Sequence, residues 1–373
     1  MNIGIDAHFL GGKQTGNETY TDNLIRSLAR IDGENKYRLY VTKKCILVGN
    51  LFENNNFHAE LVNCGNRWGR VFFRLPLELV ENKVDLFHLQ YFPPLILSSK
   101  FVVTVHDISF NFFPRWFSPI ESIKLKFVAL AIKKAKRIIA VSEFTKSQIL
   151  SVYDLAEERI TVIYNGVSDI FRPIEDLNLT REMKNKYNLP EDFILYVGRM
   201  DARKNIEGLL RIFSRFKVIT KRKEKLVLAG DSVHYFDKIH KLSKALGIEG
   251  DIILTGYIPE EDLPAVYNSS RLFASFSFYE GFGLPPLEAM ACGIPVIVSD
   301  IPVFSEVLAD AAAMVDPNQT ELAARRIAEI LENEILYNEM SLQGIKQAKK
   351  FSWLETAKKT LEVYNQVNKY NKK

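Results

Sequence analysis

The chain has 373 residues, 47% of them hydrophobic and 25% charged, and its formal net charge is +4. This length allows two domains that each bury a core, and charges so nearly balanced give no reason to expect a nucleic-acid partner. The three cysteines, Cys45, Cys64 and Cys292, lack the spacing of a metal or redox site, which suits a reducing, cytoplasmic environment.

The N-terminal residues predict a strand, a glycine loop and a helix. Residues 2–7 alternate as a strand does, and no basic segment precedes them, so no signal peptide is expected. No apolar run reaches the roughly 18 residues of a transmembrane helix. The loop HFLGGKQTGNE leads into TYTDNLIRSLARI, in which Leu24, Leu28 and Ile31 share one helical face. Such a loop usually holds a ligand near the helix N-terminus, although G-x-G-x-x-G is absent.

Strands and helices alternate through the rest of the first half, which predicts a parallel α/β domain. Residues 67–81 are predicted to be helical with an interruption at Pro76, and the stretch from 42 to 64 is less regular. The domain is expected to end near Gly166, and DIFRPIEDLNLT, residues 169–180, is interpreted as a linker. The strands are predicted at 37–41, at LFHLQ, at FVVTVHD, at 137–142 and at 160–164.

One predicted helix, IKLKFVALAIKKAKR from Ile123 to Arg137, is basic and apolar together. Such a segment is compatible with weak attachment to an anionic membrane surface. Because it leads directly into the strand RIIAVS, we favour a helix packed on the sheet with its lysines in solvent.

The second half repeats the α/β alternation, with strands predicted at 193–197, 226–229, 251–256, 272–278 and 295–299 and a mostly helical tail from 321 to 373. Two α/β halves place a cleft where the carboxyl ends of their strands face each other.

The segment FYEGFGLPPLEAMACGIPVIVSD, residues 278–300, predicts a strand end, a glycine turn, a helix and a further strand. Free amides at a helix start attract anions. Two carboxylates, Glu280 and Glu288, frame the turn and can accept hydrogen bonds from hydroxyl groups. A ligand that carries both an anionic group and hydroxyl groups would suit this segment, and a sugar nucleotide is such a ligand.

Two further loops carry groups that suit this ligand. In YVGRMDARKN, Arg199 and Lys204 follow a strand, and two cations at its carboxyl end suit a diphosphate. His106 follows the strand FVVTV, where it can hydrogen-bond sugar hydroxyls or stabilise developing charge.

The spacing of Glu280 and Glu288 within EGFGLPPLEAMACGIPVI resembles the E-x7-E signature of glycosyltransferase family 4, the retaining GT-B enzymes. The resemblance implies an α/β fold of the GT-B type, with two Rossmann-like parallel-sheet domains facing a cleft. We expect an acceptor-side domain at 1–172, a nucleotide-sugar domain at 173–350, and a final helix in 351–373 that crosses back to the first domain.

The resemblance also assigns roles to residues of this chain. Arg199 and Lys204 would bind the donor diphosphate, and His106 would lie beside the transferred sugar. Gly16 matches a glycine that lies against the diphosphate, although Thr15 stands where many relatives carry a second glycine. Glu280 would contact the sugar. The remaining predicted donor contacts are Tyr257 and Ile258 at the base, Glu288 at the ribose, and Phe282, Gly283 and Leu284 in the glycine turn.

The expected activity is retaining transfer of a hexose from a nucleotide diphosphate sugar in cell-surface polysaccharide biosynthesis. TGNETYTDNL and TVHDISFNFFP resemble a bacterial branch rich in mannosyltransferases, which favours GDP-mannose over a UDP-sugar. The acceptor would be a glycan or a lipid-linked intermediate, handled at the cytoplasmic face of a membrane. No cofactor is expected, and since D-x-D is absent, no metal site is expected.

Two other classes of function stay open. A nucleotide-sugar epimerase of GT-B fold would rearrange the sugar without a second acceptor. A non-catalytic sugar-binding protein with two α/β lobes would normally be exported, and would have no need for Arg199 and Lys204 beside two glutamates. An NAD dehydrogenase is disfavoured because the dinucleotide fingerprint is missing.

Overall fold

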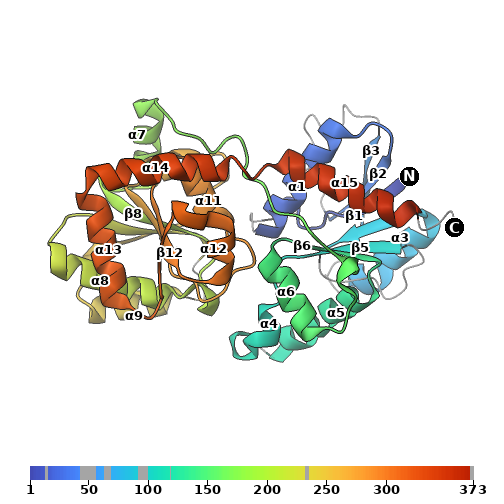
Figure 1. The fold of residues 1–373 in the computed structure, drawn as a ribbon, viewed down its shortest axis with the longest axis horizontal. Coiled ribbons are helices and arrows are strands. Elements are labelled where there is room, and N and C mark those ends of the chain that lie inside the picture. Colours follow the sequence, from blue (N-terminus) through green and yellow to red (C-terminus); the bar gives the residue numbers. More distant parts are fainter. Residues whose placement is uncertain are drawn as a thin grey trace. The chain divides into compact units, whose positions relative to one another are not determined.

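The computed structural model describes residues 1–12, 16–42, 56–62, 69–90, 100–117, 119–231 and 235–369 (Figure 1). Thr15, Cys45 and Cys64 lie outside these ranges, as do the first residues of the helix predicted from 67 and the last four of the tail. The chain divides into two compact units, the first made of Met1–Gly166 with Ser352–Lys373 and the second of Val167–Phe351. The N-terminal segment of the first unit therefore ends at Gly166, whereas the sequence predicted a boundary at 172.

The first unit holds a parallel sheet in the order β3-β2-β1-β4-β5-β6-β7. β3 lies in the less regular stretch from 42 to 64, where the sequence predicts no strand. It is an edge strand with partly exposed residues, so its hydrophobic pattern is weak. The strands are β1 (Asn2–Asp6), β2 (Lys36–Val41), β3 (Phe57–Leu61), β4 (Leu86–Leu89), β5 (Lys100–Val105), β6 (Arg137–Ala140) and β7 (Ile160–Val162).

The helices of the first unit include one from the far end of the chain. α15 packs against α1, and the Trp353 ring meets Tyr20 edge-on at 5.9 Å between ring centroids. Pro76 lies in the first turn of a helix, where a proline is tolerated, and a π-helical turn at Arg70–Arg74 precedes it. The α-helices are α1 (Gly16–Ile31), α3 (Leu75–Glu81), α4 (Ser109–Phe112), α5 (Pro119–Lys134), α6 (Glu143–Val152) and α15 (Trp353–Lys369).

α5 is the helix whose sequence is both basic and apolar. Its Val128, Ala131 and Ile132 side chains are buried in the hydrophobic core of the first unit. This burial supports the packed interpretation, and membrane contact through α5 stays a prediction. Within the described ranges, no helix is long and apolar enough to cross a membrane.

The segment interpreted as a linker is ordered and belongs to the second unit. Phe171 is buried and meets Tyr267 edge-on at 5.8 Å between ring centroids. α7 (Leu177–Lys186) begins inside the supposed linker because the Asp176 side chain accepts a hydrogen bond from the Asn178 N–H and caps the helix. The linker prediction was therefore wrong for these residues, where polar composition outweighed the helix start signal.

The second unit holds a parallel sheet in the order β10-β9-β8-β11-β12-β13, covered by helices on both faces (Figure 1). β13 was not predicted, because three residues at a sheet edge carry little pattern. The strands are β8 (Phe193–Val197), β9 (Lys225–Ala229), β10 (Ile252–Gly256), β11 (Leu272–Ser275), β12 (Val296–Ser299) and β13 (Ala313–Val315). The remaining α-helices are α8 (Ile206–Thr220), α9 (Phe236–Ala245), α10 (Leu263–Asn268), α11 (Leu284–Ala291), α12 (Pro302–Leu308), α13 (Thr320–Glu332) and α14 (Glu334–Ala348).

All strand pairs of both sheets are parallel, so each unit gathers its strand-to-helix loops at one edge. In the first unit that edge carries His106, directly after β5. In the second unit it carries Arg199 and Lys204 after β8, Tyr257 after β10 and Glu280 after β11. The predicted site residues therefore lie where ligands of parallel α/β sheets bind.

Candidate functional site

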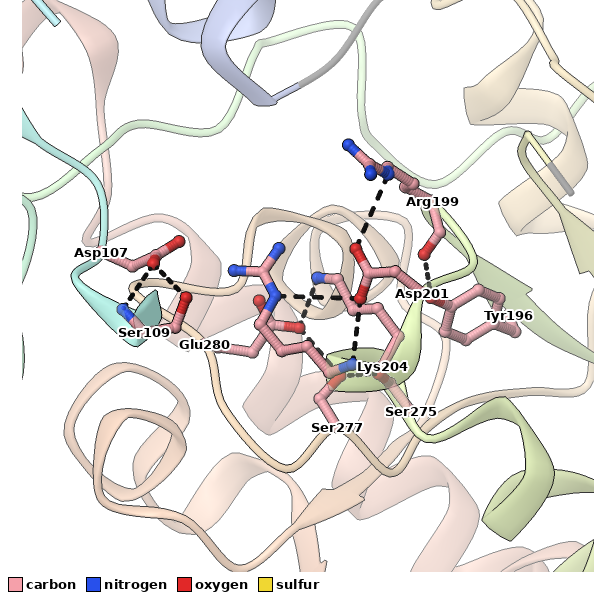
Figure 2. Close-up of polar contacts among 10 residues, drawn as sticks. Asp107, Ser109, Tyr196, Arg199, Asp201, Lys204, Ser275, Ser277 and Glu280 are labelled. Carbon is pink, nitrogen blue, oxygen red and sulfur yellow. Dashed lines mark hydrogen bonds and ion pairs between the residues drawn. The ribbon is translucent and has the colours of Figure 1, made fainter. Parts of the chain in front are cut away.

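The centre of the candidate site in the second unit is a buried ion pair. The Nζ atom of Lys204 lies 2.5 Å from Oε1 of Glu280, and the Ser277 hydroxyl donates to the same oxygen at 2.8 Å (Figure 2). The Lys204 side chain is 15% exposed and that of Glu280 is 11% exposed. The β8–α8 and β11–α11 loops thus bring together a cation and a carboxylate that are 76 residues apart.

The surroundings keep Glu280 ionised. Burial raises its pKa, but the charges of Lys204 and Arg203 and the hydrogen bonds from Lys204 and Ser277 outweigh burial and hold it below its ordinary value. A carboxylate in this state accepts hydrogen bonds and donates none. Glu280 is therefore equipped to receive a hydroxyl group of a ligand.

The turn that carries the two predicted cations is tied to the loop of Glu280. Asn205, in a left-handed conformation, caps α8 by accepting from the Gly208 N–H, and its side-chain amide donates to the Phe276 carbonyl at 3.0 Å. The Phe278 N–H donates to the Arg203 carbonyl at 2.9 Å. These bonds fix Lys204 beside Glu280. Lys204 itself closes a 3₁₀ turn directly before the N-cap of α8.

Arg199 differs from Lys204 in its exposure. Its side chain is 70% exposed, with Nε 3.7 Å from Oδ2 of Asp201, while its carbonyl accepts from the Tyr196 hydroxyl (Figure 2). An exposed pair of this kind is weak, so the guanidinium can turn toward an anion at little cost. The structure does not bring Arg199 into contact with Glu280 within the described residues.

The glycine turn before α11 is shaped for a close backbone approach. Gly283 has φ +98°, and a Cβ there would lie 2.6 Å from the Phe304 ring. Pro285 and Pro286 lack an N–H group. The start of α11 can therefore offer an anion the backbone N–H groups of Gly283 and Leu284. The Phe282 side chain is buried against Phe351, so its predicted ligand contact would be through the backbone.

Glu288, in α11, is buried and accepts a hydrogen bond at Oε2 from the Tyr267 hydroxyl at 2.8 Å. Burial raises the pKa of Glu288 to about 7, with a smaller contribution from Glu260 and an opposing one from the Tyr267 hydrogen bond. Tyr267 of α10 thus fixes one of the carboxylate oxygens, and the sequence analysis did not single out this residue.

The loop after β10 carries the two residues predicted at the nucleotide base. The Tyr257 side chain is 37% exposed, whereas Ile258 is buried. An exposed aromatic ring beside a strand end can stack on a base. Ile258 can contribute a backbone contact only.

In the first unit, Gly16 begins α1, and among the described residues no atom lies within 4 Å of a Cβ built there. The described residues therefore give no steric reason for glycine at this position. The preceding loop is closed by Glu18, whose Oε1 accepts from the Gly11 and Gly12 amides at 2.6 and 3.1 Å. A carboxylate at these amides shows that the loop accommodates negative charge.

His106 lies partly buried at the end of β5, with its Nε2 atom 2.9 Å from the Gln90 side-chain oxygen. The Tyr20 ring meets it edge-on at 4.8 Å between ring centroids. Burial lowers the pKa of His106 to about 4, and the neighbouring Asp107 opposes this only partly. The ring is neutral near pH 7.

Among the described residues, no group of three or more His, Cys, Asp or Glu side chains is placed to hold a metal ion. Cys292 is buried and burial raises the pKa of its thiol, which makes it a packing residue.

Comparison with known families covers both units. Residues 180–350 match the family described as glycosyl transferases group 1, and residues 15–169 match glycosyltransferase family 4. O-antigen chain mannosyltransferase B of Escherichia coli is 34% identical over 266 residues, which are 70% of this chain and 69% of the relative. The chain belongs to the group 1 glycosyltransferases.

Other relatives of this glycosyltransferase match over smaller shares of their length. O-antigen chain mannosyltransferase RfbU of Salmonella typhimurium is 30% identical over 58% of this chain and 56% of its own length. Serotype-specific mannosyltransferase WbdA of Escherichia coli is 32% identical over 63% of this chain, which spans only 29% of that relative.

Solved structures show the GT-B fold for the glycosyltransferase. Sucrose-phosphate synthase of Thermosynechococcus elongatus superposes with a TM-score of 0.80 at 18% identity, covering 98% of this chain and 99% of that one. HepE of Anabaena, in a complex with UDP-glucose, gives a TM-score of 0.78 at 18% identity, covering 98% and 100% of the two chains. The two parallel α/β units of the glycosyltransferase thus have the expected fold class.

Several residues that shape the candidate site were missed by reasoning from sequence. Ser277, Tyr267 and Gln90 each bind a predicted site residue through a side chain. A serine, a tyrosine and a glutamine within apolar stretches carry no signal of such a role. Only Asn205, directly before a helical pattern, had a recognisable capping signature.

Proposed function

We propose that this glycosyltransferase moves a mannosyl group from GDP-mannose to a glycan or lipid-linked acceptor, with retention of the anomeric configuration and without a divalent metal ion. The observation that carries the proposal is the ion pair between Lys204 and the buried Glu280, in two loops that also carry the exposed Arg199 and lead into the N-terminus of α11. The mannosyltransferase relatives support the choice of sugar.

The leaving diphosphate is proposed to be neutralised by groups of the second unit, together with the glycine loop at Gly16 in the first. Lys204, Arg199 and the amides of Gly283 and Leu284 supply positive charge and donors after β8 and before α11. Preorganised groups of this kind stabilise the charge that develops as the bond to the sugar breaks. A divalent ion would then not be required for this task.

Glu280 is proposed to orient the sugar. Its Oε1 accepts from Lys204 and Ser277, which leaves Oε2 as the oxygen to accept from a sugar hydroxyl. The lowered pKa keeps the group in the accepting form at neutral pH. When the diphosphate attracts Lys204, the charge of Glu280 becomes more available to the sugar.

The group transfer is proposed to follow the front-face route that the family resemblance implies. The bond between the anomeric carbon and the diphosphate oxygen breaks, and the acceptor oxygen forms its bond on the same face of the sugar. The acceptor proton passes to an oxygen of the leaving diphosphate. No side chain is assigned as a nucleophile.

The other donor contacts are proposed at the positions predicted from sequence. Glu288, held by Tyr267, would accept from the ribose hydroxyls, while Tyr257 and Ile258 would contact the base. Gly16 would lie against the diphosphate and His106 beside the sugar.

The test is nucleoside diphosphate release from a panel of sugar nucleotides, each measured with and without a mannose-containing acceptor. The proposal expects acceptor-dependent release of GDP from GDP-mannose. Equal release from UDP-glucose would overturn the choice of donor. Conversion of the sugar without any acceptor would point instead to an epimerase.

A further inference from the structure

A chain of hydrogen bonds joins His106 to the first turn of α1. His106 Nε2 contacts the Gln90 side-chain oxygen at 2.9 Å, and the Gln90 amide nitrogen donates to the Thr21 hydroxyl. The Thr21 hydroxyl donates to the Asn17 carbonyl at 2.7 Å. Gln90 and Thr21 are both buried, at 5% and 1% exposure. The chain ends one residue from Gly16, so it connects the two donor contacts proposed for the first unit.

The Asn17 carbonyl fixes the direction of every bond in this chain. A carbonyl can only accept, so the one hydroxyl proton of Thr21 is used there. Thr21 Oγ1 must then accept from its other neighbour, which has to be the Gln90 amide nitrogen. The Gln90 oxygen consequently faces His106 and requires an N–H at Nε2. The reverse orientation of Gln90 would place its oxygen against a hydroxyl that has no proton left to give.

We propose that Gln90 and Thr21 are positioning residues that hold His106 as the neutral tautomer with its hydrogen on Nε2. The inference rests on the proposed function in one respect, which is that His106 meets the transferred sugar. In this tautomer Nδ1 carries the lone pair, so the ring serves a sugar hydroxyl as a hydrogen-bond acceptor. His106 then neither donates a proton nor contributes a positive charge to the reaction.

The surroundings of His106 agree with a neutral ring. Among the described residues, the titratable groups around it include Tyr20 of α1, His88 of β4 and Asp107 in the following loop. His88 is itself held between the Tyr364 hydroxyl at 2.6 Å and Thr104 at 2.8 Å, and burial lowers its pKa to about 3. Of these groups, Asp107 favours a charged His106, and burial outweighs it.

The direct test is NMR of histidine ring nitrogens in the full chain, whose six histidines give few signals. A His106→Gln sample identifies the resonance of His106 by its loss. The wild-type protein should show hydrogen on Nε2 across the neutral range, and Gln90→Leu should convert His106 to a mixture of tautomers. Hydrogen on Nδ1 in the wild type, or an unchanged tautomer in Gln90→Leu, overturns the proposal.

A matched pair at Thr21 covers the case in which Gln90→Leu does not fold. Thr21→Val keeps the shape of the side chain but removes the hydroxyl. Like Gln90→Leu, it should convert His106 to a mixture of tautomers. Thr21→Ser restores the hydroxyl and should restore the wild-type ring state. Equal ring states in the valine and serine variants contradict the proposal.

Turnover separates this inference from the proposed function. If both hold, Thr21→Val lowers kcat about tenfold to a hundredfold and Thr21→Ser recovers most of it, since a displaced group loses rate steeply. A mixture of His106 tautomers in Thr21→Val with unchanged turnover would support the positioning role of Gln90 and Thr21 and contradict the sugar contact of His106. Lowered turnover with an unchanged tautomer would overturn the positioning role.

Discussion

Lys204 Nζ lies 2.5 Å from Glu280 Oε1, and the two opposite charges therefore neutralise each other within the candidate site. A salt bridge this deeply placed gains little net stability, because both ions lose hydration. A diphosphate would compete with Glu280 for the ammonium group. We therefore read the pair as a site arranged for ligand charge more than as a device for stability.

Replacing Lys204 with alanine should lower kcat by about two to three orders of magnitude. The reason is that removal of a preorganised electrostatic group from a developing oxyanion costs about 2.7–4 kcal/mol. The measurement is nucleoside diphosphate release by the purified, folded variant. Turnover close to that of the wild type would refute the assignment of Lys204 to the leaving group.

Lys217 offers a matched control for that variant. It is a lysine of α8 with an 18% exposed side chain, and it is 3.3 Å from Asp251, away from the candidate site. Lys217→Ala removes a lysine of similar exposure from the same unit and should leave turnover unchanged. A similar loss of turnover in both variants would mean that Lys204 acts through stability.

Alanine variants of the two signature glutamates, Glu280 and Glu288, should differ in their effects on ligand binding. Glu288→Ala should weaken the free nucleoside diphosphate as well as the whole donor, because ribose hydroxyls would lose their acceptor. Glu280→Ala should spare nucleoside diphosphate binding and lose turnover, since its proposed contact is with the sugar. Isothermal titration calorimetry checks both, and the opposite order would exchange the two roles.

Glu288 should also make stability depend on pH. Its pKa is raised from 4.5 to about 7 in the folded protein, so the fold holds a proton that the unfolded chain releases between these values. The contribution of Glu288 to the free energy of unfolding is fully present below about pH 4.5 and is lost as the pH rises to about 7. Glu288→Gln should therefore gain up to about 3 kcal/mol in unfolding free energy at pH 8 relative to wild type.

The same variant should show no such gain at pH 4, where the wild-type carboxyl is protonated in both states. Urea denaturation at the two pH values measures the difference. An equal effect of Glu288→Gln at pH 4 and pH 8 would show that Glu288 does not titrate in this window.

The sequence predicted the α/β fold well because buried parallel strands form continuous apolar runs, such as the one before His106. It failed where local pattern is short or polar, as at the edge strands β3 and β13 and in α7, which depends on the Asp176 cap. The signature glutamates stand out by spacing. Their partners Ser277 and Tyr267 do not, because the first contact depends on the exact conformation of one loop and the second forms only when α10 packs beside α11.

Gly16 and Gly283 should respond differently to alanine. At Gly283 the φ of +98° and the nearby Phe304 ring both oppose a Cβ, so Gly283→Ala should lose at least about 1–2 kcal/mol of stability. At Gly16 the described protein leaves space for a Cβ, and alanine is the better helix former. Gly16→Ala should keep or slightly raise the melting temperature and still weaken donor binding.

Thermal unfolding and donor titration of these two variants decide whether Gly16 serves a ligand. A Gly16→Ala protein that binds donor as the wild type does would remove Gly16 from the proposed site. A destabilised Gly16→Ala protein would instead give the glycine a structural role.

Transfer should proceed in excess chelator at close to its normal rate and retain the anomeric configuration. In the proposed site the leaving diphosphate would meet Lys204, Arg199 and the amides of Gly283 and Leu284, which together would supply the charge that a divalent ion otherwise brings. Proton NMR of the product reports the configuration, and a rate assay with and without chelator reports the metal requirement. Activity lost in chelator and restored by magnesium or manganese would show that these groups do not suffice, and an inverted product would rule out the front-face route.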